Sequence, residues 1–153
     1  MIKVTLELYR YQELSILSRA RALEAFQERA FKAFSNSANE KAKESLEKIA
    51  MIAKVTEKEE ASGDLAFQGL QTIINNSPVL ESSKTDRLLA KVIENFQYDG
   101  SLKFRENLKA LKKTFMAELD DFKNKAEHDP DMIEAYILNN NVWLLENGEE
   151  FEL

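Results

Sequence analysis

The stretch FRENLKALKKTFMAELDDFK, residues 104–123, decides the helical character of this chain. Its large apolar side chains recur at intervals of four, three, four, four and three residues: Phe104, Leu108, Leu111, Phe115, Leu119 and Phe122. This spacing places them on one face of an α-helix, because the helix turns once every 3.6 residues. Most of the other positions are charged or polar, so the pattern predicts a helix with one face in a core and the other in solvent.

The same periodicity, in weaker form, predicts further helices along the chain. They cover residues 16–34, 42–60, 65–74, 83–96 and 130–138. Ser15 and Asp64 precede two of these segments and can cap free backbone N–H groups, and Asp129-Pro130 is a typical helix start. The polar run from Ser35 to Asn39 separates the first two segments, so we expect a break in the helix there.

The two ends of the chain have strand patterns instead. Apolar and polar residues alternate from Ile2 to Leu8, which is typical of a half-buried strand. Residues 142–145 form an apolar run, and Asn147-Gly148 is a favoured two-residue hairpin turn before the returning segment 149–153. We expect this hairpin to pair with the N-terminal strand, because an isolated hairpin is only marginally stable. The predicted fold is therefore α+β: a single domain over residues 1–153, with a mostly helical body of five to six helices and a small antiparallel sheet.

The net charge of −6, from 27 acids and 21 bases, is unevenly distributed along the chain. Residues 127–153 contain eight Asp and Glu but no Lys or Arg, whereas residues 1–126 carry a net charge of +2. A concentrated acidic face repels nucleic acid and attracts basic protein surfaces. The C-terminal segment is therefore either a solvated face or a binding surface for a partner with a basic surface or groove.

Few residues in this chain could carry out catalysis. The sequence has no Cys, its one His is His128, and its four Gly stand singly, which excludes a thiol nucleophile and a phosphate-binding glycine loop. Pairs of acids on one helical face, Glu24 with Glu28 and Glu118 with Asp121, leave a metal-dependent carboxylate enzyme as an alternative. The prediction is a protein that is not an enzyme and that uses no cofactor or metal.

Nucleic acid and membranes are not favoured as partners. Two basic stretches, residues 19–32 and 103–113, contain interspersed acids, and the overall charge is negative. Glu7 interrupts the N-terminal apolar residues before a signal peptide forms, and no apolar run approaches the roughly 20 residues that a membrane span needs. We expect a cytoplasmic protein. The oligomeric state stays open, because part of the apolar seam in residues 104–122 could be a dimer contact.

Both ends of the chain are similar to those of a loose group of small phage and prophage proteins. The opening Leu8-Tyr9-Arg10-Tyr11-Gln12-Glu13-Leu14-Ser15 resembles that group's Leu-Tyr-x-aromatic-x-Glu-Leu-Ser pattern of a short strand that runs into an Ala-spaced helix. Ser18 stands where the pattern usually has Ala. The segment from Trp143 to Phe151 resembles the group's C-terminal aromatic strand and Glu-x-Gly turn. The resemblance implies an origin in a mobile element and transfers no catalytic residue; some members of the group are labelled antitoxin-like.

Charge and resemblance together lead to a functional hypothesis. We expect a non-enzymatic, phage-derived binding protein that inhibits a host macromolecule in the host cytoplasm. A defence nuclease, of the CRISPR or restriction kind, is the first partner to consider, because its nucleic-acid channel is a basic groove. The alternatives are an antitoxin that neutralises a partner toxin and a virion or assembly component. The predicted partner-binding residues all come from the acidic segment: Asp131, Glu134, Trp143, Glu146, Glu149 and Glu150.

Overall fold

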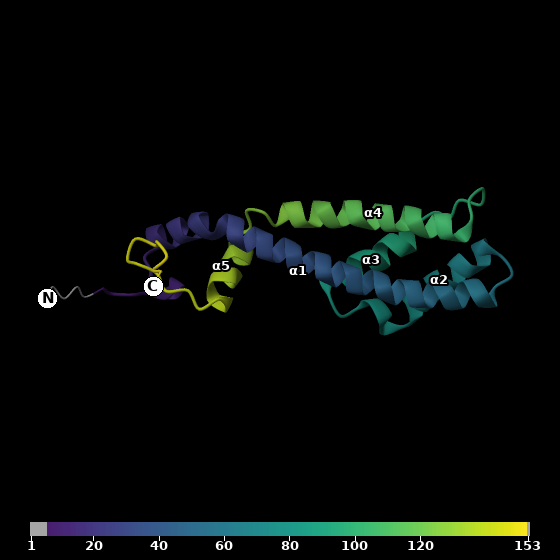
Figure 1. Ribbon diagram of the computed structural model, residues 1–153, viewed down its shortest axis with the longest axis horizontal. Helices are drawn as coiled ribbons and strands as arrows, with labels where there is room; N and C mark the ends of the chain where they lie inside the picture. Colours follow the sequence, from purple (N-terminus) through teal and green to yellow (C-terminus); the bar gives the residue numbers. More distant parts are fainter. Residues whose placement is uncertain (1–5, 153) are drawn as a thin grey trace. The chain divides into compact units, whose positions relative to one another are not determined.

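The computed structural model describes residues 6–152, and these residues fold as an all-α protein. The α-helices are α1 (Ile16–Glu59), α2 (Gly63–Asn76), α3 (Lys84–Asn95), α4 (Phe104–Lys125) and α5 (Pro130–Asn139), shown in Figure 1. Two short 3-10 turns, η1 (Tyr11–Glu13) and η2 (Pro78–Leu80), lie before α1 and α3. Within the described range, no helix is both long enough and apolar enough to cross a membrane.

The α+β prediction is wrong, because the described residues contain no β-strand or sheet. Tyr9 pairs with Leu144, and Leu144 pairs with Glu150, but only as isolated antiparallel bridges. The predicted N-terminal strand lies mostly in residues 1–5, outside the described residues. The pairing cannot lengthen past Tyr9, because the chain turns into η1 two residues later. On the other side, Asn141 has a positive φ of 51° as the chain leaves α5, just before the paired segment.

The predicted break at residues 35–39 is also wrong, because α1 continues through it to Glu59. This run contains no Gly or Pro, and the helix propensities of Ser and Asn cost only a few tenths of a kcal/mol relative to good helix formers. Ala38 is buried within the run, and the Asn39 side chain accepts a hydrogen bond of 2.9 Å from Lys123. Tertiary contacts therefore outweigh the weak local preference for a break.

Two of the three predicted helix starts are confirmed. The Ser15 hydroxyl accepts from the backbone N–H of Ser18, and Asp129 caps α5 with Pro130 in its first turn. The third cap is corrected: Ser62 rather than Asp64 caps α2, through a hydrogen bond of 3.2 Å from the backbone N–H of Leu65. Ser and Asp are comparable capping residues. With Ser62 as the cap, α2 begins at Gly63.

The chain forms two compact units, and each is described by itself. Unit 1 comprises Met1–Asn36 with Asn124–Leu153, and unit 2 comprises Ser37–Lys123, so that α1 contributes to both. The core of unit 1 includes Tyr11, Leu14, Ala22, Phe26, Ala30, Ile133, Ile137 and Leu144. The expectation of one domain over the whole chain stays a prediction.

Unit 2 is built on the antiparallel pairing of α4 with the second part of α1. Arg105 at the start of α4 lies 3.5 Å from Glu57, and Lys123 near its end binds Asn39. Figure 1 shows α4 running beside this part of α1. The predicted seam of α4 is confirmed as core: Phe115 and Leu119 have no exposed surface, and Leu108 and Phe122 pack against the buried cluster. Buried residues from α2 and α3 complete this core: Ala66, Phe67, Leu70, Ile74, Leu89, Val92 and Ile93.

Candidate functional site

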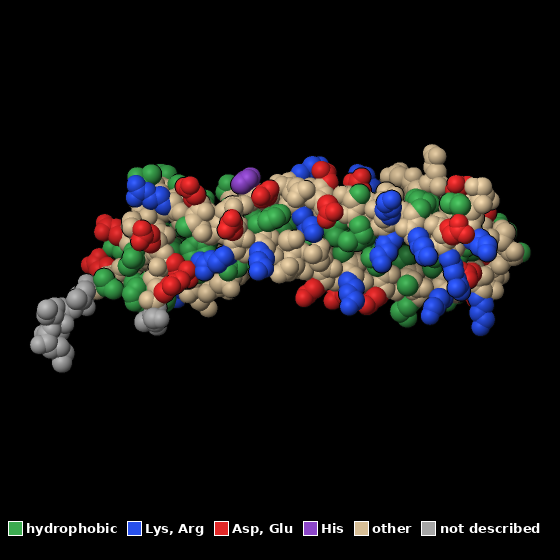
Figure 2. All heavy atoms as spheres, turned by 45° about the horizontal axis from the view of Figure 1, so that its top comes forward, with side chains coloured by type: hydrophobic (Ala, Val, Ile, Leu, Met, Phe, Trp, Pro, Cys, Tyr) green, Lys and Arg blue, Asp and Glu red, His purple; other side chains and the backbone are tan. Residues whose placement is uncertain are grey.

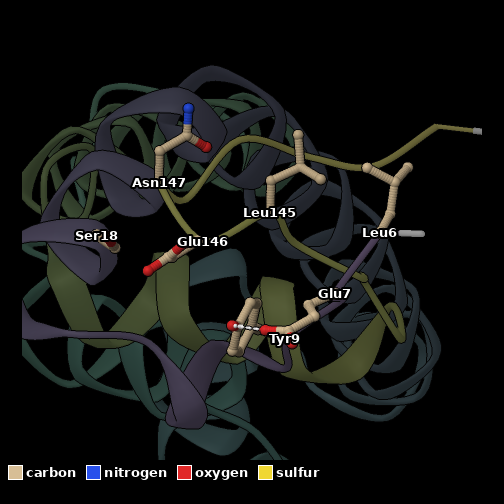
Figure 3. Close-up of a pocket in the computed structure, with 7 residues that line it drawn as sticks. All are labelled: Leu6, Glu7, Tyr9, Ser18, Leu145, Glu146 and Asn147. Atoms are coloured by element: carbon tan, nitrogen blue, oxygen red, sulfur yellow. Dashed lines mark hydrogen bonds between the residues drawn. The ribbon is translucent and has the colours of Figure 1, made fainter. Parts of the chain in front are cut away.

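The two ends of the chain form an open pocket of about 850 Å³ in unit 1. Tyr9 and Leu144 exchange two backbone hydrogen bonds of 2.8 and 2.9 Å, which hold the N-terminal segment beside the C-terminal turn. We call this hollow the acidic pocket, and its lining residues are drawn in Figure 3: Leu6, Glu7, Tyr9, Ser18, Leu145, Glu146 and Asn147. Two of these seven residues are carboxylates, and none of the lining residues that the structure describes is Lys or Arg.

The turn that carries Glu146 depends on a glycine. The Leu145 N–H donates to Glu149, and the Gly148 N–H donates to Leu145, which makes a three-residue loop rather than the two-residue turn predicted. Gly148 has a φ of +92°, a conformation that residues with side chains rarely adopt. A Cβ atom at this position would overlap the backbone carbonyl of Ser18. Glycine therefore lets the turn lie directly on α1, and Glu146 projects from it toward Ser18 (Figure 3).

Three carboxylates act on Tyr9 in the acidic pocket: Glu7, Glu146 and Glu13. The Tyr9 hydroxyl donates a hydrogen bond of 2.7 Å to the Glu7 carboxylate. This bond, partial burial and the charges of Glu7, Glu146 and Glu13 raise the pKa of Tyr9 above its usual value. Deprotonating this phenol would add a negative charge beside three others. A Lys or Arg side chain would instead be stabilised in its charged form here.

The raised pKa of Tyr9 gives a test of these interactions. Replacing Glu7 with Gln removes a charge and a carboxylate acceptor, so the pKa of Tyr9 should fall toward its ordinary value. Glu146→Gln should lower it less, because Glu146 acts through charge alone. An NMR titration of the tyrosine ring carbons measures each change, with Glu24→Gln on the exposed face of α1 as the control. If the pKa of Tyr9 were unchanged in Glu7→Gln, the Glu7 carboxylate would not act on Tyr9 as its geometry indicates.

Two of the six predicted partner-binding residues are already engaged within the chain. The guanidinium of Arg10 lies over the Trp143 ring, 3.6 Å from its centroid, and donates to the Val142 carbonyl. Glu150 forms an ion pair of 2.7 Å with Arg29. Trp143 is 42% exposed, so its free surface can still contact a partner, whereas the Glu150 charge is partly neutralised.

The other four predicted residues fall into two groups. Glu146 lines the acidic pocket, and Glu149 is exposed in the adjoining turn. Asp131 and Glu134 lie on α5, and in the described part of the chain no hydrogen bond or ion pair joins them to residues 143–150. The charge of Glu134 acts on Tyr11 instead: burial first, and this charge second, raise the pKa of that phenol.

The sequence reasoning missed the N-terminal half of this site. Glu7, Tyr9 and Glu13 line the acidic pocket or act on it through their charge, but the predicted partner-binding residues were taken from residues 127–153 alone. The signal was present, because the two chain ends were expected to pair. Pairing Tyr9 with Leu144 brings Glu7 and Glu146 to the same pocket.

Other candidate sites do not assemble into a reactive centre. His128 is exposed in the loop before α5. Among residues 6–152, no three His, Cys, Asp or Glu side chains are grouped so that they could hold a metal ion. A buried polar cluster in unit 2 joins Asp86 to Ser45, Ser82 and Lys48, but Asp86 is only 2% exposed and its oxygens are occupied by these donors. This cluster connects α3 to α1.

Comparisons of this chain with protein-family models, with curated proteins and with solved structures found no match.

Proposed function

We propose that this chain is a non-enzymatic binding protein whose acidic pocket receives Lys or Arg side chains from the basic surface of a partner protein. The observation that carries the proposal is the pocket itself, where Glu7 and Glu146 from opposite ends of the chain line one hollow and no base stands among its lining residues within the range 6–152. Charge complementarity of this kind speeds association and selects the partner.

The distribution of charge between the two units supports this proposal. Unit 1 contains twelve Asp and Glu against seven Lys and Arg, whereas unit 2 contains fifteen against fourteen. Two bases of unit 1 are held within the chain, since Arg10 covers Trp143 and Arg29 binds Glu150. Asp131, Glu134 and Glu149 then serve as outer charges that attract a basic surface, and Glu7 and Glu146 make the direct contacts.

The specific form that we propose is inhibition of a nuclease in the host cytoplasm. A nuclease channel presents closely spaced Lys and Arg that bind phosphates, and carboxylates on a folded scaffold can occupy the same positions. Such an inhibitor needs no catalytic group of its own. The similarity of the chain ends to phage proteins makes a host defence nuclease the first partner to test.

The proposal is tested by capture and by inhibition. Immobilised wild-type chain and the variant Glu7→Lys with Glu146→Lys are each incubated with bacterial lysate at low salt and eluted with high salt. We expect a basic protein that elutes from the wild type alone, because exposed charge contacts are screened by salt. Its nuclease activity should fall when the wild-type chain is added. A captured protein that binds both forms equally would contradict binding through the acidic pocket. A captured protein whose nuclease activity the chain does not lower would contradict the inhibition.

A further inference from the structure

Unit 2 has an apolar groove of about 500 Å³ between α1 and α4. Its apolar lining comes from Ala42, Leu46, Ile49, Ala50, Ala53, Leu108, Leu111 and Met116. Ala42, Ile49, Ala53 and Leu111 are almost fully buried and form the floor, whereas Ala50 and Met116 are exposed at the edges. Three charged residues also line the groove, and two of them are bases: Lys43, Glu47 and Lys112.

The groove exists because α1 carries small side chains where it borders α4. Ala42, Ala50 and Ala53 extend only one carbon from the helix, so they leave space beside Leu108 and Met116. The lining on α1 runs from Asn39 to Ala53, which corresponds to roughly 20 Å, or about four helical turns. Small residues allow a further helix to approach closely, and the length suits an α-helical segment of about 15 residues.

The charge along the groove is predominantly basic on the α4 side. Residues 104–117 contain four bases, Arg105, Lys109, Lys112 and Lys113, and a single acid, Glu106. Arg105 contacts Glu57, but in the described part of the chain no carboxylate lies within 4.0 Å of the other three bases. Figure 2 shows many Lys and Arg side chains on the part of the molecule that unit 2 occupies, with apolar side chains and some Asp and Glu between them.

We propose that this groove binds an amphipathic helix of a partner protein, one whose apolar seam is flanked by Asp and Glu. The apolar floor takes the seam, and Lys109 and Lys112 attract the acidic flank. The basic stretch 103–113 then has a role that the acidic pocket of unit 1 does not explain. Nucleic acid fits the groove poorly, because the described residues that line it include no aromatic ring for bases to stack on. This inference is independent of the function proposed for unit 1.

Two synthetic helical peptides test the proposal directly. Each has about 15 residues with Leu at every third or fourth position; one has Glu along the flanks of this seam, and the other has Lys in the same places. Fluorescence anisotropy of the labelled peptides measures binding to the full chain. We expect the Glu peptide to bind at least about tenfold more tightly, which corresponds to about 1.4 kcal/mol. Equal binding of the two peptides would overturn the proposal.

Variants with matched controls locate the binding. Ala50→Trp fills the groove from an exposed position and should weaken the Glu peptide at least about tenfold. Met51→Trp adds the same ring on α1, at a position that is 73% exposed and outside the groove, and should have no effect. Lys109→Glu with Lys112→Glu should reverse the preference between the peptides, whereas Lys84→Glu with Lys91→Glu on α3 should not. Circular dichroism verifies that each variant is folded.

Three further outcomes would overturn the proposal. The first is unchanged peptide binding by a folded Ala50→Trp variant. The second is a dimer in analytical ultracentrifugation that Ala50→Trp dissociates, since the groove would then bind a second copy of the chain. The third is tighter binding of a labelled single-stranded oligonucleotide than of the Glu peptide, if the Lys109→Glu, Lys112→Glu variant no longer binds the oligonucleotide. In that case α4 would bind nucleic acid.

Discussion

Replacing Asp86 with Ala is expected to lower the free energy of unfolding by about 3 kcal/mol, because it disrupts a buried ionic cluster. The carboxylate of Asp86 accepts hydrogen bonds from Ser45, from the Ser82 hydroxyl at 2.6 Å and from the Lys48 ammonium at 2.9 Å. Without it, Lys48 loses its partner at a half-buried position, and the link between α3 and α1 is lost. Urea unfolding followed by circular dichroism measures the change.

Asp120 provides a matched control for this substitution. It also forms an ion pair, at 3.4 Å from Lys123, but its side chain is 66% exposed and water already solvates its charge. Asp120→Ala should therefore cost less than about 0.5 kcal/mol. If the two substitutions destabilised the chain equally, the buried cluster would not be the stabilising contact that its geometry indicates.

The same cluster should make stability depend on pH. Burial by itself would raise the pKa of Asp86, but the hydrogen bonds from Ser45, Ser82 and Lys48 outweigh it and leave the pKa below its usual value. A lowered pKa in the folded state means that the unfolded state binds the proton first. The contribution is therefore complete above about pH 4, the ordinary carboxyl value, and is lost as the pH falls through the folded pKa. Between about pH 5 and pH 3, the wild type should lose more stability than Asp86→Ala; parallel losses would contradict this assignment.

Reversing the two charges of the acidic pocket is expected to weaken partner binding at least about 100-fold. Close charge pairs across an interface contribute about 1.5 kcal/mol or more each, and Glu7→Lys with Glu146→Lys replaces two attractions with repulsions. Both residues are exposed, so the variant should fold as the wild type does. Glu24→Lys with Glu28→Lys makes the same change in net charge on the exposed face of α1, outside the pocket. This control should keep nearly full affinity.

Parts of the fold could be predicted because they depend on local patterns. The seam of α4 and the start of α5 at Asp129-Pro130 are examples, since helical spacing and capping act within a few residues. The continuation of α1 through residues 35–39 could not be predicted in this way. It depends on Ala38 and Asn39 contacting the rest of unit 2.

The candidate site shows the same limit. Glu146 was identified from the density of acids near the C-terminus, but its neighbours Glu7 and Tyr9 come from the other end of the chain. No local sequence pattern identifies Asp86 either, because the partners that surround it include Ser45, 41 positions away in the sequence. The sheet was overpredicted, because alternation and a favoured turn sequence indicate strands without showing how far the pairing extends. Here it stops at isolated bridges.

The dissociation constant of the captured partner tests the central claim most directly. Isothermal titration calorimetry compares the wild type, the Glu7→Lys, Glu146→Lys variant and the Glu24→Lys, Glu28→Lys control at the same low salt concentration. The account predicts a loss of at least about 100-fold for the pocket variant and less than about threefold for the control, with wild-type affinity falling as salt rises. Equal losses in both variants would contradict it, because binding would then depend on net charge and not on the pocket that the two chain ends form.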